Sequence, residues 1–408
     1  MDAVVAEIGG PAEATIIGSG RRTTAPNASL VNSLLVRFLD FNDVGGGGHN
    51  SDALASLLAI AERERRTGAE LLTALVVSYE LGARFADAVT SRPVGRPIVG
   101  SLEDWTKDIR AGFNQPPALG RLLGLTEEQI ANAIGICLSH TLPLGILDAH
   151  REEATMAKNL RYDWAAHDAI LACLLARRGF TGPRRIIESD VGVAAVVARG
   201  EMDLDGLADF SGWRILETRF KSLALNGTTH GHVLATLGIV VDEDLHPDDI
   251  AAVRIRAPVR EVRRTTAPPK KYPRNAESAD HSAHFANAIA IRDRAISAAS
   301  VEPRNFTDPV VLDLIERITV EPDPALGYYQ GASEIVTRDG RRFERQVSEP
   351  HGFGDSPLSD REIEDKVRGL AAGLVEPQQI ERLIETCWGL DRLDDLSRLT
   401  RLLVIGSG

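Results

Sequence analysis

Residues 69–89, AELLTALVVSYELGARFADAV, decide the fold class, because apolar residues recur in them at spacings of three and four. That spacing places apolar side chains along one side of an α-helix. The run is apolar on most of its sides, so we expect it to lie in the centre of a helical domain. The same spacing predicts further helices at 29–39, 51–66, 117–123, 126–141 and 156–178.

Strand patterns begin only in the second half of the chain. Residues 253–257, VRIRA, alternate as a half-buried strand does, and the segments 334–337 and 342–347 flank an Asp339-Gly340 turn that is typical of a β-hairpin. A further strand is expected at 318–321, with helices at 231–241, 281–291 and 309–315. This block is therefore α+β.

Helical spacing returns near the end of the chain. Ser359 with Glu362 predicts a capping box, as does Thr126 with Gln129 earlier on, and 377–386 and 393–403 are amphipathic. We predict a mainly α fold with two domains. Residues 1–217 and 358–408 would form an all-helical domain, and residues 218–357 a smaller α+β lid domain.

The composition is that of a globular protein. Of the 408 residues, 43% are apolar, and the formal net charge is −12. An acidic chain argues against a nucleic-acid partner. No run approaches the ~18 apolar residues of a membrane span, and the first residues lack the pattern of a signal peptide. Three widely spaced cysteines, Cys137, Cys173 and Cys387, suit reduced thiols, so we expect a cytoplasmic protein.

The stretch 39–52, LDFNDVGGGGHNSD, is the first candidate for chemistry. Asp40 and Asp43 precede His49 across four consecutive glycines. Glycines let the backbone bend closely around a small ligand, at an entropic cost that a simple connection has little reason to carry. A flexible surface turn uses the same residue types, so both interpretations stay open. No phosphate-loop motif is present.

Other candidate groups lie along both halves of the chain. His140 ends an apolar helix, where it is either a cation favoured by the helix dipole or a simple cap. Lys158 and Arg161 share one helix face and could hold a carboxylate or remain solvated. The stretch 221–232, KSLALNGTTHGH, places Lys221, His230 and His232 around glycines before a helix, which is typical of an anion-facing helix start.

Two further patterns concern charge and metals. Residues 254–274 carry eight basic residues against the single acid Glu261, and such a strip would concentrate small anions. His230 and His232 could suggest a metal, but no third ligand has a supporting spacing, so we expect none. A base, several cations, acids and no cofactor motif together suit proton abstraction next to a carboxylate.

Five stretches in order resemble the MmgE/PrpD family, which includes 2-methylcitrate dehydratase, cis-aconitate decarboxylase and iminodisuccinate epimerase. They are LDFND…GHNSDALASLL (39–58), GLTEEQIANAIGICLSH (124–140), AKNLRYDWAAHDAILACLLARRGFTGP (157–183), RFKSLALNGTTHGH (219–232) and ADHSAHFANAIAI (279–291). The wording of the first is most similar to the methylcitrate dehydratase branch. The resemblance implies a homodimer without metal or cofactor and an active site between the two domains.

The resemblance also implies roles for individual residues. The family's active-site aspartate and histidines fall on Asp40, His49 and His140, and its lid lysine on Lys221. We expect Lys221 to bind a substrate carboxylate, helped by His230 and, from the helical side, by Lys158 or Arg161. We therefore predict a carbon–oxygen lyase that dehydrates a hydroxy di- or tricarboxylate such as 2-methylcitrate. The alternatives are a decarboxylase, an epimerase, or a non-catalytic member, which Val44 in place of the usual threonine and the all-glycine loop before His49 would favour.

Overall fold

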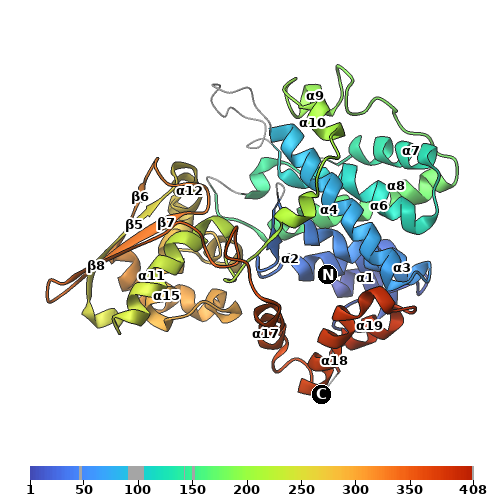
Figure 1. Cartoon of the computed structure of the whole chain (residues 1–408). Helices are drawn as coiled ribbons and strands as arrows, with labels where there is room; N and C mark the ends of the chain where they lie inside the picture. The colour runs from blue at the N-terminus through green and yellow to red at the C-terminus, as the bar shows by residue number, and fades with distance from the viewer. Residues whose placement is uncertain (46–47, 91–104, 142, 149–151, 407–408) are drawn as a thin grey trace.

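The computed structural model describes the chain except for residues 46–47, 91–104, 142, 149–151 and 407–408. The described part is mainly helical and carries one small mixed sheet (Figure 1). The sheet and its helices lie on one side of the view, and the larger helical part lies on the other. The expected fold class is thus confirmed as mainly α with an α+β portion.

The first half of the chain supplies most of the helical part. Its helices are α1 (Asp2–Ile8), α2 (Ala25–Arg37), α3 (Leu54–Arg63), α4 (Gly68–Thr90), α6 (Ala111–Leu123), α7 (Glu127–Leu138), α8 (Arg161–Arg177), α9 (Val193–Val196) and α10 (Leu204–Ala208). The long run quoted first forms α4, which packs on α6. The capping box at Thr126 is present and begins α7, while Gly124, in the left-handed conformation, ends α6.

The end of the chain packs against the same core. Its helices are α17 (Asp360–Ala371), α18 (Pro377–Trp388) and α19 (Ser397–Leu402). One buried apolar cluster contains Leu57 of α3, Leu119 of α6 and Ile170 of α8 together with Leu396 and Leu399 near the chain's end. Each fully buried aliphatic side chain of this cluster contributes about 1.5–3 kcal/mol to the stability of the fold.

The α+β portion is built on a four-stranded sheet in the order β6-β5-β7-β8. Its strands are β5 (Ile250–Ala257), β6 (Ile318–Pro322), β7 (Gly331–Thr337) and β8 (Arg342–Val347). β5 pairs with β6 in parallel and with β7 antiparallel, and β7 and β8 form the expected hairpin. Gly340, with φ of 88°, makes the hairpin turn possible because glycine adopts positive φ without strain.

Helices cover one face of this sheet. They are α11 (His230–Asp242), α12 (Val259–Thr265), α13 (Pro268–Lys271), α14 (Ala276–Ala279), α15 (Ala283–Asp293) and α16 (Pro309–Arg317). Val253 and Ile335 from the strands, with Phe285 and Leu314 from α15 and α16, form a second buried cluster. The division into two domains, with boundaries at 217/218 and 357/358, stays a prediction.

Two pairs of short strands complete the fold, and the second of them joins the two halves of the chain near the site. β1 (Ala14–Thr15) pairs with β2 (Arg22–Thr23), and β3 (Asp43–Val44) pairs antiparallel with β4 (Arg219–Phe220). The second pairing brings the segment before His49 beside the segment before Lys221. None of the helices in the described ranges is both long and apolar enough to cross a lipid bilayer.

Candidate active site

A cavity of about 160 Å³ lies where the helical part meets the α+β part. Its walls come from a loop and the starts of helices in the first half of the chain, and from the second half of the chain on the opposite side. It is lined by Val44, Gly45, Gly48, His49, Lys107, Asp108, Arg110, Arg161, Arg219, Asn226, Gly227, Thr228, Arg260, Arg264, Tyr328 and Tyr329. The β3–β4 pair crosses its edge.

The charge of this cavity is strongly positive. Six of the lining residues are lysine or arginine, and one, Asp108, is a carboxylate. Within the described part of the chain, neither Arg219 nor Arg260 forms an ion pair; each lies near a tyrosine ring, at 5.7 Å and 5.9 Å. In a protein of net charge −12, a cavity with this excess of cations favours small anions.

His49 is the imidazole that faces the cavity. Its Nδ1 lies 2.5 Å from the carbonyl oxygen of Asp43, so Nδ1 carries the hydrogen and Nε2 keeps its lone pair. Its own carbonyl accepts a hydrogen bond from Arg110 at 2.7 Å. Burial, then Lys221 and Arg37, hold the pKa of His49 well below its usual value. His49 is therefore a neutral base with an oriented lone pair.

Asp40 lies at the Nε2 edge of this imidazole. Its Oδ1 lies 3.4 Å from His49 Nε2, and the residue has a φ of 44°, an unusual conformation for an aspartate just past the end of α2. Lys221 donates to both the carboxylate, at 2.7 Å, and the carbonyl of Asp40, at 2.6 Å. Burial opposes ionisation, yet the neighbouring ammonium of Lys221 holds the pKa of Asp40 well below its usual range. The carboxylate would stabilise His49 once the imidazole accepts a proton.

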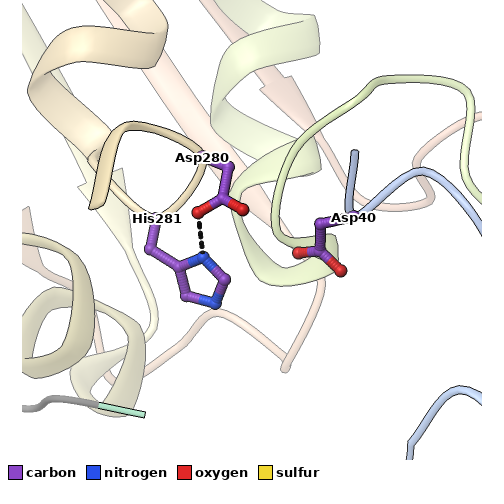
Figure 2. Close-up of side chains that lie close together, drawn as sticks. All are labelled: Asp40, Asp280 and His281. Atoms are coloured by element: carbon purple, nitrogen blue, oxygen red, sulfur yellow. Dashed lines mark hydrogen bonds and ion pairs between the residues drawn. The ribbon is translucent and has the colours of Figure 1, made fainter. Parts of the chain in front are cut away.

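A second lysine–aspartate pair lies next to the first. Lys158 donates to Asp280 at 2.8 Å and lies 3.1 Å from Nδ1 of His281. Figure 2 shows Asp280 and His281 together on one turn, with Asp40 on a separate segment opposite them. Burial, then Lys158, lower the pKa of His281 to about 4. Asn226, which lines the cavity, lies 2.7 Å from Nε2 of His281 and so connects this pair to the cavity wall.

Asp40, Asp280 and His281 also have the residue types of a metal site. Their ligand atoms all lie within 4.8 Å of one another. However, the ammonium groups of Lys221 and Lys158 already lie 2.7 Å and 2.8 Å from the two carboxylates. A divalent cation there would have to displace both lysines, so this donor set fits a metal poorly.

The predicted site residues thus separate into two groups. His49 and Arg161 line the cavity, whereas Asp40, Lys221 and Lys158 form the buried pairs behind it. Arg161 also pairs with Asp108. Lys221 was expected to hold a substrate carboxylate; here its ammonium is occupied by Asp40, and the expected role stays a prediction.

The structure does not bring His140 and His230 to the cavity wall. His140 is exposed at the end of α7, where Nδ1 contacts the carbonyl of Ile136 at 3.0 Å. His230 is fully buried, and both of its ring nitrogens face main-chain groups, of Asn226 at 3.1 Å and of Leu223 at 3.3 Å. His230 therefore contributes structure to the turn that carries Asn226.

The glycine loop is only partly described, since Gly46 and Gly47 lie outside the described residues. Gly45 and Gly48 exchange backbone hydrogen bonds of 2.9 Å and 3.0 Å. A Cβ on Gly48 would approach Arg110 Nη1 at 2.3 Å, so this position needs glycine for the close contact. Asp43 accepts hydrogen bonds from Ser51 and holds the turn after His49.

Only some residues of the basic strip at 254–274 line the cavity. Arg260 and Arg264 line the cavity, but Arg254 pairs with Glu321 at 2.7 Å on the sheet. Sequence reasoning missed Lys107, Tyr328, Asp280 and His281 as site residues. The latter two lie inside the stretch 279–291 that carried the family resemblance, so a search of that stretch for titratable pairs could have found them.

Comparison with known proteins shows the family of the chain. The MmgE/PrpD N-terminal domain model matches residues 1–205, and the MmgE/PrpD C-terminal domain model matches residues 224–390. The chain belongs to the MmgE/PrpD family. The resemblance noted in the sequence is therefore confirmed over nearly the whole chain.

Three relatives are similar to the chain at low identity. A cis-aconitate decarboxylase-like protein, oryM, of Aspergillus oryzae is 24% identical, covering 95% of this chain and 84% of its own length. The cis-aconitate decarboxylases of Homo sapiens and Mus musculus are 26% and 27% identical; each comparison covers 92% of this chain, and 79% and 78% of the respective relative. These relatives are carboxy-lyases by name, which links the MmgE/PrpD chain described here to lyases.

Proposed function

We propose that this MmgE/PrpD chain is a lyase that acts on a small di- or tricarboxylic acid without a metal or other cofactor. The observation that supports the proposal is the cation-rich cavity with the neutral imidazole of His49 at its wall. Arginine and lysine side chains bind carboxylates and stabilise negative charge that develops on the carbon beside them. A carbanion next to a carboxylate is common to the reactions considered below.

Decarboxylation is the first candidate reaction, because two of the relatives named above are cis-aconitate decarboxylases and the third is a cis-aconitate decarboxylase-like protein. The C–C bond to one carboxylate breaks, carbon dioxide leaves, and the electron pair stays on carbon until a proton arrives there. The substrate carboxylates that remain would be held by cavity cations such as Arg219 and Arg260. Lys107 is a suitable proton donor, since burial, with Arg260, Arg264 and Arg110, lowers its pKa although Tyr328 opposes this.

Dehydration of a hydroxy acid such as 2-methylcitrate is the second candidate. The oriented lone pair on Nε2 of His49 favours it, because this reaction needs a base that removes the α-proton before hydroxide leaves. Asp40, 3.4 Å away, would stabilise the imidazolium that forms. Epimerisation would use the same first step. The homodimer and the cytoplasmic location expected from the sequence stay predictions.

A substrate panel tests the proposal and separates the reactions. The purified protein would be incubated with cis-aconitate, citrate, 2-methylcitrate and smaller dicarboxylates. Carbon dioxide release reports decarboxylation, and ultraviolet absorbance of a new C=C bond reports dehydration. Activity should survive prolonged chelation, and recovery only upon adding a divalent ion would contradict the metal-free mechanism.

A binding experiment tests the substrate class without relying on turnover. Tricarballylate, a tricarboxylate without a leaving hydroxyl or double bond, should raise the melting temperature, because a ligand of the native state stabilises it. Acetate and sulfate at the same ionic strength are the matched controls and should have little effect. If no di- or tricarboxylate binds in preference to these controls, the polycarboxylate assignment is wrong.

A further inference from the structure

The helix α17 (Asp360–Ala371) is attached to the molecule in an unusual way. None of its residues is fully buried, so polar contacts of its side chains contribute much of its attachment. Figure 1 shows it between the α+β portion and the terminal helices α18 and α19. Its polar side chains make the connections: Arg368 pairs with Glu381 at 2.7 Å, and Glu362 contacts His351 at 2.6 Å.

Lys366 is the residue of α17 that reaches toward the candidate active site. Its ammonium donates to the carbonyl of Phe41 at 2.6 Å and to the carbonyl of Lys221 at 2.9 Å. It also lies 3.8 Å from the centre of the Phe41 ring. Hydrogen bonds from a charged donor are stronger than neutral ones, and cation–π contacts add to them.

These two carbonyls belong to the segments that carry the Asp40–Lys221 pair. Phe41 directly follows Asp40, whose φ of 44° must be maintained by its surroundings. Lys221 is the residue whose ammonium bonds Asp40 at 2.7 Å. One side chain of the C-terminal region therefore holds the main chains on both sides of the pair that stands behind His49.

We propose that Lys366 is a positioning residue, which holds the main chains of Phe41 and Lys221 so that the carboxylate of Asp40 stays between Lys221 and His49. It is not among the residues that line the cavity, so it acts through Asp40 and not on the substrate. The kinetic part of the proposal rests on the lyase function proposed above; the positioning itself does not.

The surroundings of Lys366 also predict a pH dependence. Burial and then Lys221 lower its pKa to about 8, while Asp43 opposes the shift. The imidazole of buried His230 faces the same charges and is neutral at this pH, because its pKa is lowered to about 3 by burial and then by Lys221. As the pH rises through about 8, the ammonium of Lys366 loses its proton, and its two hydrogen bonds weaken.

Two substitutions and a control test this. Lys366→Met keeps the length of the side chain and removes its charge; we expect kcat to fall at least tenfold with KM within twofold. Lys366→Arg keeps a charged donor at all accessible pH values, so its rate should persist to higher pH than that of the wild type. Arg361→Met removes a charge from the same helix at a side chain that is 89% exposed, and it should behave as the wild type. A wild-type kcat for Lys366→Met, or an unchanged alkaline limb for Lys366→Arg, overturns the proposal.

Hydrogen exchange separates this proposal from the proposed function. In Lys366→Met, amides of residues 39–43 and 219–223 should exchange faster, while those of α4 and β5 stay unchanged. In the wild type the same two segments should lose protection above pH 8 relative to those references. Unchanged exchange in both segments overturns the positioning role whether or not the protein is a lyase. A protein that shows the exchange changes but turns over no carboxylic acid refutes only the lyase assignment.

Discussion

The cavity wall and the layer behind it both carry basic side chains, but these side chains differ in their ion pairing. On the wall, Arg219 and Arg260 face the space without an ion pair in the described structure. Behind the wall, Lys221 and Lys158 are buried and bound to Asp40 and Asp280 at 2.7 Å and 2.8 Å. These two wall arginines are thus available to an anion from solution, whereas the two inner lysines are already paired with carboxylates.

Because of this difference, we expect the two layers to have different functions. Wall cations can bind a substrate because they exchange water or a tyrosine neighbour for a carboxylate at small cost. An inner lysine would have to leave a buried carboxylate unpaired, which costs several kcal/mol. The inner layer therefore orients His49 and sets its protonation state. The predictions below test this division, from the largest expected effect to the smallest.

The first prediction concerns His49, which lines the cavity and also contacts Asp40 of the inner layer. His49→Ala should lower kcat by about 10²–10⁴-fold with the fold intact, because a positioned base contributes a rate factor of that size. Steady-state kinetics on the substrate found by the panel measures it. His246→Ala, at an exposed loop of the α+β portion, is the matched control and should keep the wild-type rate.

His140→Ala belongs in the same experiment. The sequence predicts a loss of kcat for it as well, whereas its exposed position at the end of α7 places it away from the described cavity wall. A near-native kcat removes His140 from the site. Near-native kcat in His49→Ala would contradict the role of the imidazole even if the family assignment holds.

The second prediction tests the inner layer. Lys221→Met leaves the buried carboxylate of Asp40 without its cation, and removal of one partner of a buried pair costs about 3–5 kcal/mol of unfolding free energy. Denaturant unfolding followed by circular dichroism measures this. The double variant Asp40→Asn with Lys221→Met removes both charges and should recover part of the loss. A single variant that loses less than about 1 kcal/mol would show that the pair behaves like an exposed one.

The sequence predicted the fold well because local rules and the tertiary structure agree. The capping boxes at Thr126 and Ser359 and the turn at Gly340 all appear where the pattern placed them. Element ends moved by a few residues, as with the helix expected at 29–39, which is α2 at Ala25–Arg37. Pro26 and the cap residue Thr24 start that helix earlier, a signal that the apolar spacing alone did not reveal.

The site was predicted in part, and its missing residues have a common cause. His49, Asp40 and Lys221 lie in motifs that look unusual in sequence, so they could be selected in advance. Lys107 and Tyr328 lie in ordinary stretches and reach the cavity only because the two halves of the chain pack together. Pairings such as Lys158 with Asp280, which are 122 positions apart, depend on tertiary structure and leave no local pattern.

The third prediction concerns acid stability. His232 is fully buried, and burial lowers its pKa from 6.5 to about 4. Between these values the unfolded chain binds the proton more readily, so the unfolding free energy falls as the pH drops below 6.5. At pH 5 this one histidine should account for a loss of ~2 kcal/mol.

Melting temperatures between pH 7.5 and pH 5 measure this loss. His232→Gln cannot take up the proton and should flatten the acid side of the curve, while His246→Gln, at an exposed position, should not. His281, whose pKa is also lowered to about 4, adds a similar slope that both variants retain. An acid slope that His232→Gln leaves unchanged would mean that His232 stays charged or accessible in the folded protein.

The last prediction returns to the cavity wall and has the smallest effect. Arg260→Met removes one wall cation, and a hydrogen bond to a charged group contributes about 1.5–3 kcal/mol, so KM should rise by roughly tenfold or more. Because this contact exists in both the ground state and the transition state, kcat should change little. Arg254→Met removes an arginine from the same basic strip, but one that pairs with Glu321 on the sheet, and KM should stay near the wild-type value. If both variants raise KM equally, the whole strip attracts the substrate through its general field and not through contacts at the wall; increasing salt would then erase the effect, whereas a direct contact in the cavity is screened much less.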